Sequence, residues 1–368
     1  MSTTRTIRLT VVCVLFPLSI SSFLPVCNQG ENCLLPDCFC STFNHPLDPK
    51  EIPQIVYFGV DDGVKPEAEA YYNRLFGQER KNPNDCPISM TLYVSGEDTD
   101  YLALNEYYDR GFEIAVHSMS HTVIDTGEKL RAEAKGQRDN IINLSKNITE
   151  DMIHGWRSPY LRTAGDAQIE VLQNLSFAYD VSLLYTRKTM TDINPWPFTL
   201  DYGWTLSCEI QPCPTNRHPG FWVVPVNAMR DYGDWGACRF LDSCVNKPLS
   251  MNQTYKYIMD NFRSHYHGNR APFGIHMHAK WFNKAEHVEA MDLVIHDLLE
   301  YDDVYIVNIN QTLEWMKRPT ELQFIERFRP WRCTSQSGSI ITFHGILIFI
   351  LAVLGIGFYV KLMSKLFG

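Results

Sequence analysis

Short apolar runs alternate along this chain with amphipathic stretches of helical length. A continuous apolar run is typical of a strand buried on both faces, whereas a one-sided apolar stripe indicates a helix packed on a core. The runs predict strands at residues 55–60, 88–94, 112–116, 153–157, 177–184, 273–278 and 304–307. The stretches between them predict helices at residues 66–76, 101–110, 128–144, 167–175, 254–266 and 285–299, and a capped helix from Asn310.

The order of these elements predicts the fold class. Strands that alternate with helices of this length form parallel βαβ units. About seven such units follow one another, which favours a barrel over a half-sheet. After Asn194 the alternation lapses into an insertion rich in Cys, Pro and Trp, and it resumes beyond Pro248. We therefore expect an α/β fold, an irregular (β/α)7-type barrel with a Cys/Pro-rich insertion.

Two terminal segments lie outside this alternation. Arg5 and Arg8 precede an apolar core, and the small residues Ser19 and Ser21 fit a cleavage site, so residues 1–21 are interpreted as a signal peptide. Residues 339–360 are long and apolar enough for a C-terminal transmembrane helix, and lysines follow in a short tail. A GPI anchor is the alternative, but a polar spacer is missing and the terminal lysines disfavour it.

These boundaries divide the chain into consecutive parts. They are a signal peptide (1–21), a Cys-rich extension (22–50), the α/β domain (51–320), a juxtamembrane stalk (321–338), a transmembrane helix (339–360) and a short cytoplasmic tail (361–368). The expected protein is a single-pass type I membrane protein at the cell surface, with its main domain outside the cell. A GPI-anchored or shed form is the alternative.

Composition and cysteine content fit an extracellular domain. The net charge of −9 and the lack of a basic cluster argue against a nucleic-acid partner. Of the 11 cysteines, Cys13 leaves with the signal peptide, and the even remainder of ten predicts up to five disulfides. A zinc site in the segment 33–40 is the less favoured alternative. Five sequons predict a glycoprotein, at Asn143, Asn147, Asn174, Asn252 and Asn310.

Side chains that can bind a metal follow two of the predicted strands. Asp61 and Asp62 end the strand at 55–60, and His117 and His121 follow the strand at 112–116. If the chain turns into a helix there, two imidazoles at this spacing face the same side and can hold one ion. A carboxylate and two imidazoles form a ligand set for a divalent metal that leaves positions open for water and substrate. The second carboxylate then suits a general base.

Further candidate residues end other predicted strands. Arg157, Asp180 and His278 all fall at such positions. The carboxyl ends of the strands are the face where α/β barrels place their active sites, so the sequence predicts one site on this rim. A histidine on the side opposite the metal suits a general acid.

Five short motifs resemble those of the polysaccharide deacetylases, the NodB-like carbohydrate esterases. Asp61-Asp62 resembles the first motif and His117-Ser118-Met119-Ser120-His121 the second, His-Ser/Thr-x-x-His. The third family motif, Arg-x-Pro-Tyr, resembles Arg157-Ser158-Pro159-Tyr160. The fourth resembles Tyr179-Asp180-Val181-Ser182 with Trp196, and the fifth, Leu-x-x-His, resembles Ile275-His276-Met277-His278. The resemblance covers about residues 33–320 and is strongest to animal chitin deacetylase-like proteins, which share further segments such as 80–84, 196–202 and 269–274.

The resemblance implies metal-dependent hydrolysis of N-acetyl groups from chitin or a related N-acetylglucosamine polymer, with release of acetate. It implies that Asp62, His117 and His121 bind the metal, Zn²⁺ or another divalent ion. It also implies that Asp61 takes a proton from the attacking water, and that Arg157 fixes the charge state and orientation of Asp61. The expected partners are this glycan and, through the anchor, the membrane.

The remaining catalytic roles also follow from the resemblance. His278 would protonate the departing amine, with its pKa raised by Asp180. The backbone N–H of Tyr160 would stabilise the oxyanion. Trp196 would line the pocket that accepts the acetyl methyl group.

Two departures from the family pattern leave a second function open. Gly59-Val60 stands before the aspartates where the family usually has Thr-Phe, and His276 is an extra histidine. We expect His276 to point away from His278 and to be structural or to support a neighbouring group. The alternative function is a catalytically weak or inactive extracellular protein that binds glycans and organises a matrix. A metalloprotease is disfavoured because His-Glu-x-x-His is missing from the sequence.

Overall fold

The computed structural model describes residues 26–333 of the 368-residue chain. The predicted signal peptide, transmembrane helix and cytoplasmic tail lie outside these residues, as does the end of the predicted stalk. Between residues 26 and 333, the structure contains no helix that is both long and apolar enough to cross a membrane.

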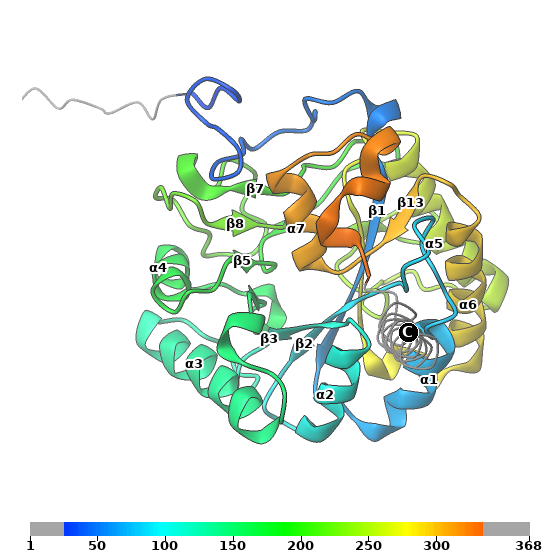
Figure 1. Ribbon diagram of the computed structural model, residues 1–368, viewed down its shortest axis with the longest axis horizontal. Coiled ribbons are helices and arrows are strands. Elements are labelled where there is room, and N and C mark those ends of the chain that lie inside the picture. The colour runs from blue at the N-terminus through cyan, green and yellow to red at the C-terminus, as the bar shows by residue number, and fades with distance from the viewer. Residues whose placement is uncertain (1–25, 334–368) are drawn as a thin grey trace, which may run out of the picture.

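A mainly parallel sheet forms the centre of the domain (Figure 1). Its strands lie in the order β12-β1-β2-β3-β4-β5-β8-β7, and β13 pairs with the first residues of β1. The edge strand β7 is antiparallel to β8. The strand bounds are β1 Gln54–Asp62, β2 Thr91–Val94, β3 Glu113–Val116, β4 Gly155–Trp156, β5 Tyr179–Asp180, β7 Phe198–Thr199, β8 Trp222–Val223, β12 Phe273–His278 and β13 Val304–Ile306.

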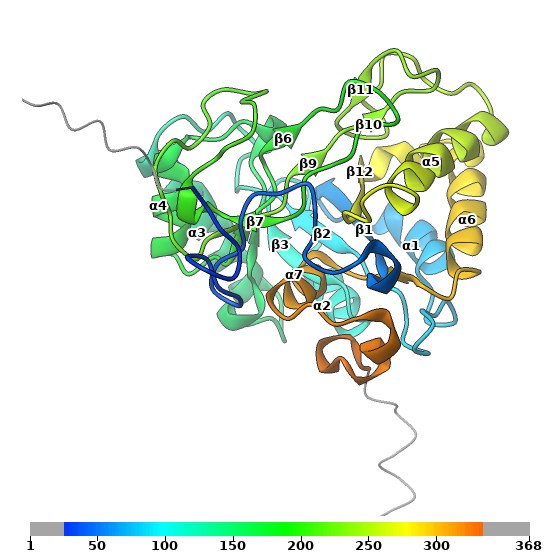
Figure 2. The ribbon, with the colours of Figure 1, turned by 90° about the horizontal axis from the view of Figure 1, so that it is seen from above.

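Helices flank the sheet, with α3 and α4 at one side and α5 and α6 at the opposite side (Figure 2). The helix bounds are α1 Glu69–Leu75, α2 Tyr101–Asp109, α3 Gly127–Leu144, α4 Asp166–Asn174, α5 Met251–Tyr266, α6 Ala285–Leu299 and α7 Ile309–Lys317. Side chains at the N-caps fix several of these starts because they satisfy free backbone N–H groups. Asn308 and Gln311, for example, form a reciprocal capping box at the start of α7.

The predicted irregular barrel is confirmed as an α/β fold but is wrong in one respect, because the sheet is open. Its hydrogen-bonded order ends at β12 and at β7, and no described strand joins these two edges. The insertion lies beside β12. It contains β10 Met229–Arg230 and β11 Ala237–Cys238, which pair with each other, and β9 Val226–Asn227, which pairs with β6 Leu184–Tyr185 from the chain before the insertion. Leu241 N donates to His276 O at 2.8 Å, so the chain after β11 runs along β12. The fold is therefore α/β with an incomplete barrel.

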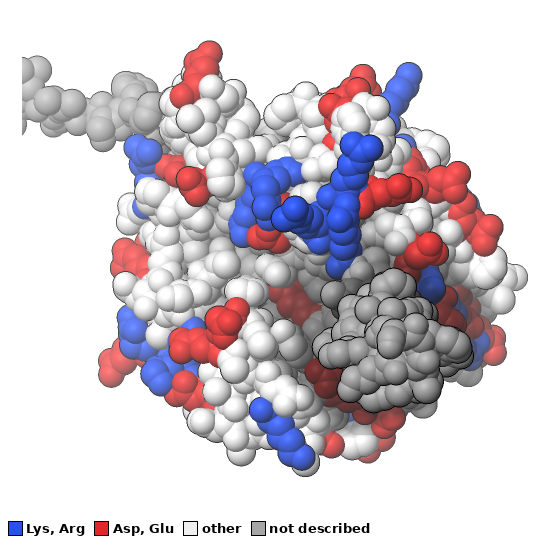
Figure 3. All heavy atoms as spheres, viewed as in Figure 1, with Lys and Arg blue, Asp and Glu red and all other residues white. Residues whose placement is uncertain are grey.

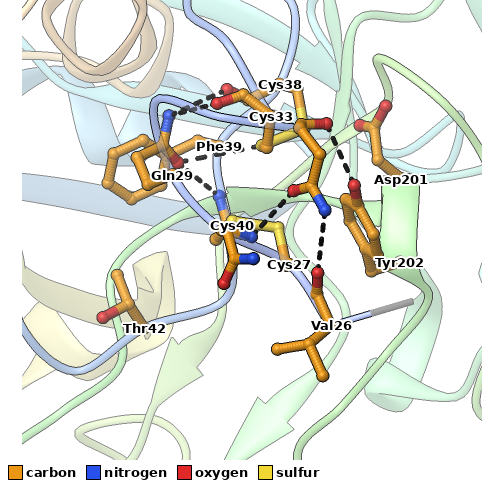
Figure 4. Close-up of a disulfide and its surroundings, with 12 residues drawn as sticks. Val26, Cys27, Gln29, Cys33, Cys38, Phe39, Cys40, Thr42, Asp201 and Tyr202 are labelled. Atoms are coloured by element: carbon orange, nitrogen blue, oxygen red, sulfur yellow. Dashed lines mark hydrogen bonds between the residues drawn. A yellow bond between two sulfur atoms is a disulfide. The ribbon is translucent and has the colours of Figure 1, made fainter. Parts of the chain in front are cut away.

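The Cys-rich extension packs on the β7 edge of the sheet. Phe39 is buried, its backbone N–H donates to Thr199 Oγ1, and its carbonyl accepts from Thr199 N. Two disulfides, Cys27–Cys40 and Cys33–Cys38, lie beside Tyr202 (Figure 4). The tyrosine hydroxyl donates to the carbonyl of Asn32. The extension therefore shields the edge strand from further pairing.

All ten cysteines of the described residues are joined in disulfides, which confirms the predicted number. The other pairs are Cys86–Cys333, Cys208–Cys213 and Cys238–Cys244. The alternative of a zinc site in the segment 33–40 is wrong because these sulfur atoms are bonded to one another. Among the sequon residues, Asn143, Asn147, Asn174 and Asn252 are exposed, and Asn310 is partly buried.

The C-terminal part of the described chain carries a basic surface. After α7 come two short 3-10 helices, η7 Leu322–Arg327 and η8 Arg329–Trp331. Lys and Arg side chains gather over this part of the face seen in Figure 3. Its exposed arginines are Arg318, Arg327, Arg329 and Arg332.

Candidate active site

Asp61 and Asp62 lie at the carboxyl end of β1, the longest strand. β1 is held between β12 on one edge and β2 and β13 on the other, so its end is fixed in the middle of the sheet. Asp61 is only 2% exposed, whereas Asp62 lies where the strand opens to solvent and has a positive φ of 85°. Such strain at a non-glycine residue is characteristic of functional sites, because surrounding structure must hold it.

His117 and His121 lie on a loop, so the chain does not turn into a helix directly after β3. β3 ends at Val116, α3 begins only at Gly127, and both Ser118 and His121 have positive φ. The buried carboxylate of Glu133 on α3 holds this loop. It accepts hydrogen bonds from the backbone N–H groups of Met119 and Ser120, both at 2.8 Å, and from the Ser120 hydroxyl at 2.6 Å.

Asp62, His117 and His121 nevertheless converge as predicted. Their potential ligand atoms lie within 4.8 Å of one another, with Asp62 Oδ1 at 3.2 Å from His121 Nε2 and 3.9 Å from His117 Nε2. Burial lowers the pKa of His117, which favours the neutral imidazole that a metal ligand requires. Asp62 Oδ1 is buried and accepts no hydrogen bond from the residues that the structure describes. An unpartnered carboxylate oxygen between two imidazole nitrogens fits a divalent cation.

Arg157 joins the base candidate to the ligand set. The guanidinium is fully buried at the end of β4, and its Nη1 donates to Asp61 Oδ1 at 2.5 Å. The backbone carbonyl of the same residue lies 2.9 Å from His117 Nδ1, and accepts its hydrogen when the ring uses Nε2 as a ligand. Arg157 therefore contacts both Asp61 and His117, as a residue that orients Asp61 must.

His278 pairs with Asp242, and the predicted pairing with Asp180 is wrong. His278 Nδ1 lies 2.8 and 3.0 Å from the two carboxylate oxygens of Asp242. Burial opposes protonation of His278, but the hydrogen bond to Asp242 and the charges of Asp242 and Asp61 outweigh it, so its pKa is raised. Asp242 comes from the insertion, in the segment that runs along β12.

Asp180 lies in a separate buried network. Its carboxylate accepts from Gln168 Nε2 at 2.5 Å and from the Ser182 hydroxyl. Ser182 Oγ in turn accepts the backbone N–H of Ser158, the residue after Arg157. Burial raises the pKa of Asp180 to about 6. This network holds the segment that follows Arg157, and it does not extend to His278.

Tyr160 and Trp196 occupy different environments. Tyr160 has a positive φ of 60°, is 57% exposed, and its ring lies 4.9 Å from that of His121, so it lies beside one of the candidate metal ligands. Trp196 is fully buried, with its ring 4.7 Å from that of His45 and 6.1 Å from that of Trp315. The prediction that Trp196 lines an acetyl pocket is therefore corrected, because this ring belongs to the core.

His276 points to the same side of β12 as His278, contrary to our expectation. Residues two apart on a strand share a face. The ring of Phe240 lies 4.8 Å from that of His278 and 6.3 Å from that of His276. His276 Nδ1 lies 2.8 Å from Arg157 Nη2.

A cleft of about 490 Å³ opens over these residues. Its floor includes Asp61, Asp62, His121 and His278, and Tyr71 and Ala279 contribute apolar wall. A volume of this order suits a small-molecule group or one unit of a longer polymer. The base candidate Asp61, the candidate metal ligands Asp62 and His121, and His278 therefore face one space.

Asp242 is the functional residue that the sequence reasoning missed. It lies in an insertion without hydrophobic periodicity, so no predicted strand end pointed to it. The sequence did contain one indication, because Asp242 lies between two closely spaced cysteines, Cys238 and Cys244. In the structure these two cysteines form a disulfide. A short disulfide loop is a rigid position from which to present a side chain.

The chain is similar in sequence to two known proteins over most of its length. The chain is 35% identical to chitin deacetylase 8 of Bombyx mori over 348 residues, which cover 89% of this chain and 87% of that protein. It is 34% identical to chitin deacetylase 1 of Bombyx mori over 334 residues, which cover 84% of this chain and 60% of that longer protein. It is also similar to the solved peptidoglycan deacetylase PdaC of Bacillus subtilis, with 17% identity, 78% and 100% coverage and a TM-score of 0.39. No protein-family model matches.

The match to chitin deacetylase 8 covers most of both chains at 35% identity, which establishes the protein family. The chain belongs to the polysaccharide deacetylases, as the five motifs indicated. Within that class, it belongs with the chitin deacetylases.

Proposed function

We propose that this chain is a metal-dependent N-deacetylase that removes acetyl groups from chitin or a related N-acetylglucosamine polymer. The observation that carries the proposal is the position of the Asp61–Arg157 pair beside three side chains that could hold a metal ion, with His278 lining the same cleft as Asp61. The names of both relatives support the substrate class.

The first step needs a base beside an activated water. A divalent cation held by Asp62, His117 and His121 would polarise that water and the acetamide carbonyl. Asp61 accepts the proton, because Arg157 holds Oδ1 while Oδ2 lies only 3.8 Å from His117 Nε2, next to the ligand set. The backbone N–H of Tyr160 is proposed to donate to the oxyanion.

The second step needs an acid for the leaving amine. His278 lines the same cleft, and Asp242 keeps its pKa raised, so it remains protonated to a higher pH than an isolated histidine. Donation of that proton releases the free amine of the sugar and leaves acetate.

The test of this function is acetate release from chitin oligomers by the zinc-loaded protein. Asp61→Asn is expected to reduce kcat by about 1,000-fold or more, because it removes the base while keeping the shape of the side chain. Asp302→Asn is the matched control, since Asp302 is an exposed carboxylate outside the cleft. Zinc measured by elemental analysis should stay bound in Asp61→Asn and be lost in His117→Ala.

The same experiment separates the enzyme from the non-catalytic alternative. Background-level release by both the unaltered protein and Asp61→Asn would exclude the deacetylase. Retained binding of chitin oligomers in that case would instead favour a glycan-binding protein.

We also propose an extracellular location, anchored through residues 339–360. The five disulfides support an oxidising compartment. Resistance to alkaline carbonate extraction, together with resistance to a phospholipase that cleaves GPI anchors, would support the transmembrane helix. Release by that phospholipase would favour the GPI alternative.

A further inference from the structure

One buried histidine beside the active site has no part in the proposed reaction. His276 is 3% exposed and lies at the centre of the β1–β12 pair, where its partner across the ladder is Gly59. Both residues are departures from the family pattern noted in the sequence. Because Gly59 and His276 are paired, the two differences from the family pattern lie in contact with each other.

The imidazole of His276 acts as a hydrogen-bond acceptor for Arg157. Its Nδ1 lies 2.8 Å from Arg157 Nη2, and a guanidinium can only donate, so Nδ1 accepts and the ring hydrogen lies on Nε2. Burial and the charge of Arg157 lower the pKa of His276 well below its usual value, which keeps Nδ1 available. Nε2 has no hydrogen-bond partner among the described residues. The ring therefore carries a desolvation cost that its contact with Arg157 offsets.

Gly59 supplies the space that this ring occupies. A Cβ atom at residue 59 would lie 2.9 Å from His276 Nδ1, 3.0 Å from Tyr93 Cε2 and 3.3 Å from Arg157 Nη1. The first of these separations is shorter than a carbon atom tolerates, and the contacted atoms sit in a packed interior that moves little. A larger residue at position 59 would displace the imidazole or the guanidinium.

The guanidinium is held on every side. Nε donates to the carbonyl of Val181 at 3.0 Å, Nη1 to Asp61 Oδ1 at 2.5 Å and Nη2 to His276. The guanidinium carbon lies 3.8 Å from the centre of the Tyr93 ring. Without His276, Nη2 would be a buried donor without a partner, and the group would gain by rotating away from Asp61.

We propose that His276 is a positioning residue that, seated against Gly59, holds Arg157 so that Nη1 stays on the Asp61 carboxylate. The proposal rests on the proposed function, in which Asp61 is the base. Asp61 then keeps the orientation that proton transfer requires, without any contact between His276 and substrate.

Two substitutions separate this role from simple packing. His276→Leu removes the acceptor and keeps most of the volume, whereas Asn Oδ1 in His276→Asn can occupy the position of Nδ1. We expect His276→Leu to lower kcat by about 10- to 100-fold with KM within about twofold, and His276→Asn to retain kcat within about threefold. His265→Leu is the control, since His265 is a buried histidine outside the cleft whose ring nitrogens contact the carbonyl of Ala271 and the side-chain amide of Asn194. All variants are assayed below their own melting temperatures.

Equal losses in His276→Leu and His276→Asn, or no loss in His276→Leu, would overturn the proposal. Crystal structures of both variants judge it independently of turnover. The Arg157–Asp61 contact should be broken in His276→Leu and kept in His276→Asn. If the unaltered protein has no deacetylase activity, the proposed function fails, but these structures still decide the role of His276.

The pairing with Gly59 has its own stability test. Gly59→Ala should lower the melting temperature of the unaltered protein more than it lowers that of His276→Ala, because the added methyl group then finds free space. An equal decrease in both backgrounds would show that the ring and the glycine are not complementary.

Discussion

At the scale of single residues, the charge of Asp242 sets the range of pH over which His278 can act as an acid. Asp242→Asn keeps an oxygen that can accept from Nδ1 but removes the negative charge, so the pKa of His278 should fall. His278 works in its protonated form, and the loss of activity at high pH should therefore begin earlier. We expect the alkaline limb of kcat/KM to move down by about one pH unit.

The pH profile distinguishes a shift in the pKa of His278 from a general loss of activity. At low pH, where His278 is protonated in both proteins, Asp242→Asn should approach unaltered activity. The raised pKa of His278 also contributes to the free energy of unfolding. This contribution is present at low pH and disappears as the pH rises through that pKa. A uniform loss of activity at all pH values would contradict the assigned role of Asp242.

The residues that could be predicted from the sequence are those fixed by strand ends. Asp61 and Asp62 end β1 and Arg157 directly follows β4, and strand direction alone brings such ends to one rim. The partner of His278 could not be predicted in this way. Asp180 ends a strand and Asp242 does not, but the path of the insertion along β12 brings Asp242 closer.

At the scale of elements, α3 holds the loop that carries two of the candidate metal ligands. Glu133→Ala removes the carboxylate that binds the backbone of Met119 and Ser120, so the loop loses its fixed conformation. We expect the zinc dissociation constant to rise by about 10- to 100-fold, as is usual when a group that orients ligands is removed. Competition with a chromophoric chelator measures it.

A second glutamate on the same helix is the control. Glu128 lies exposed in the first turn of α3, and Glu128→Ala should leave zinc affinity unchanged. An unchanged zinc affinity in correctly folded Glu133→Ala would show that the loop is held by other contacts.

The elements also differ in how well the sequence predicted them. The helix at 285–299 and the strand at 273–278 were predicted with the observed bounds, because a one-sided stripe and a continuous apolar run specify their buried faces. The strand at 177–184 is instead interrupted between β5 and β6. The conformation of the loop 117–126 could not be predicted, because the spacing of His117 and His121 does not reveal the strained backbone that Glu133 supports.

In the molecule as a whole, the candidate active site and the attachment of the C-terminal segment lie at opposite ends of the sheet. The cleft lies at the carboxyl ends of β1 and β12, whereas Cys86 precedes the amino end of β2. Cys86 is bonded to Cys333, and Asn84 donates to the carbonyl of Trp331, so the C-terminal segment is fastened away from the cleft. Stability and chemistry can therefore be changed independently at these two ends.

The Cys86–Cys333 disulfide provides the test of that separation. It joins residues 247 positions apart, whereas Cys208–Cys213 spans 5 positions. Chain entropy predicts that removing the long-range bond lowers the free energy of unfolding by about 5 kcal/mol and the short-range one by about 2 kcal/mol. Urea unfolding of Cys86→Ala/Cys333→Ala and of Cys208→Ala/Cys213→Ala measures the difference. Both should keep unaltered kcat in the absence of urea, because neither pair lines the cleft. Equal destabilisation would mean that local packing, and not restriction of the unfolded chain, is what the long-range disulfide supplies.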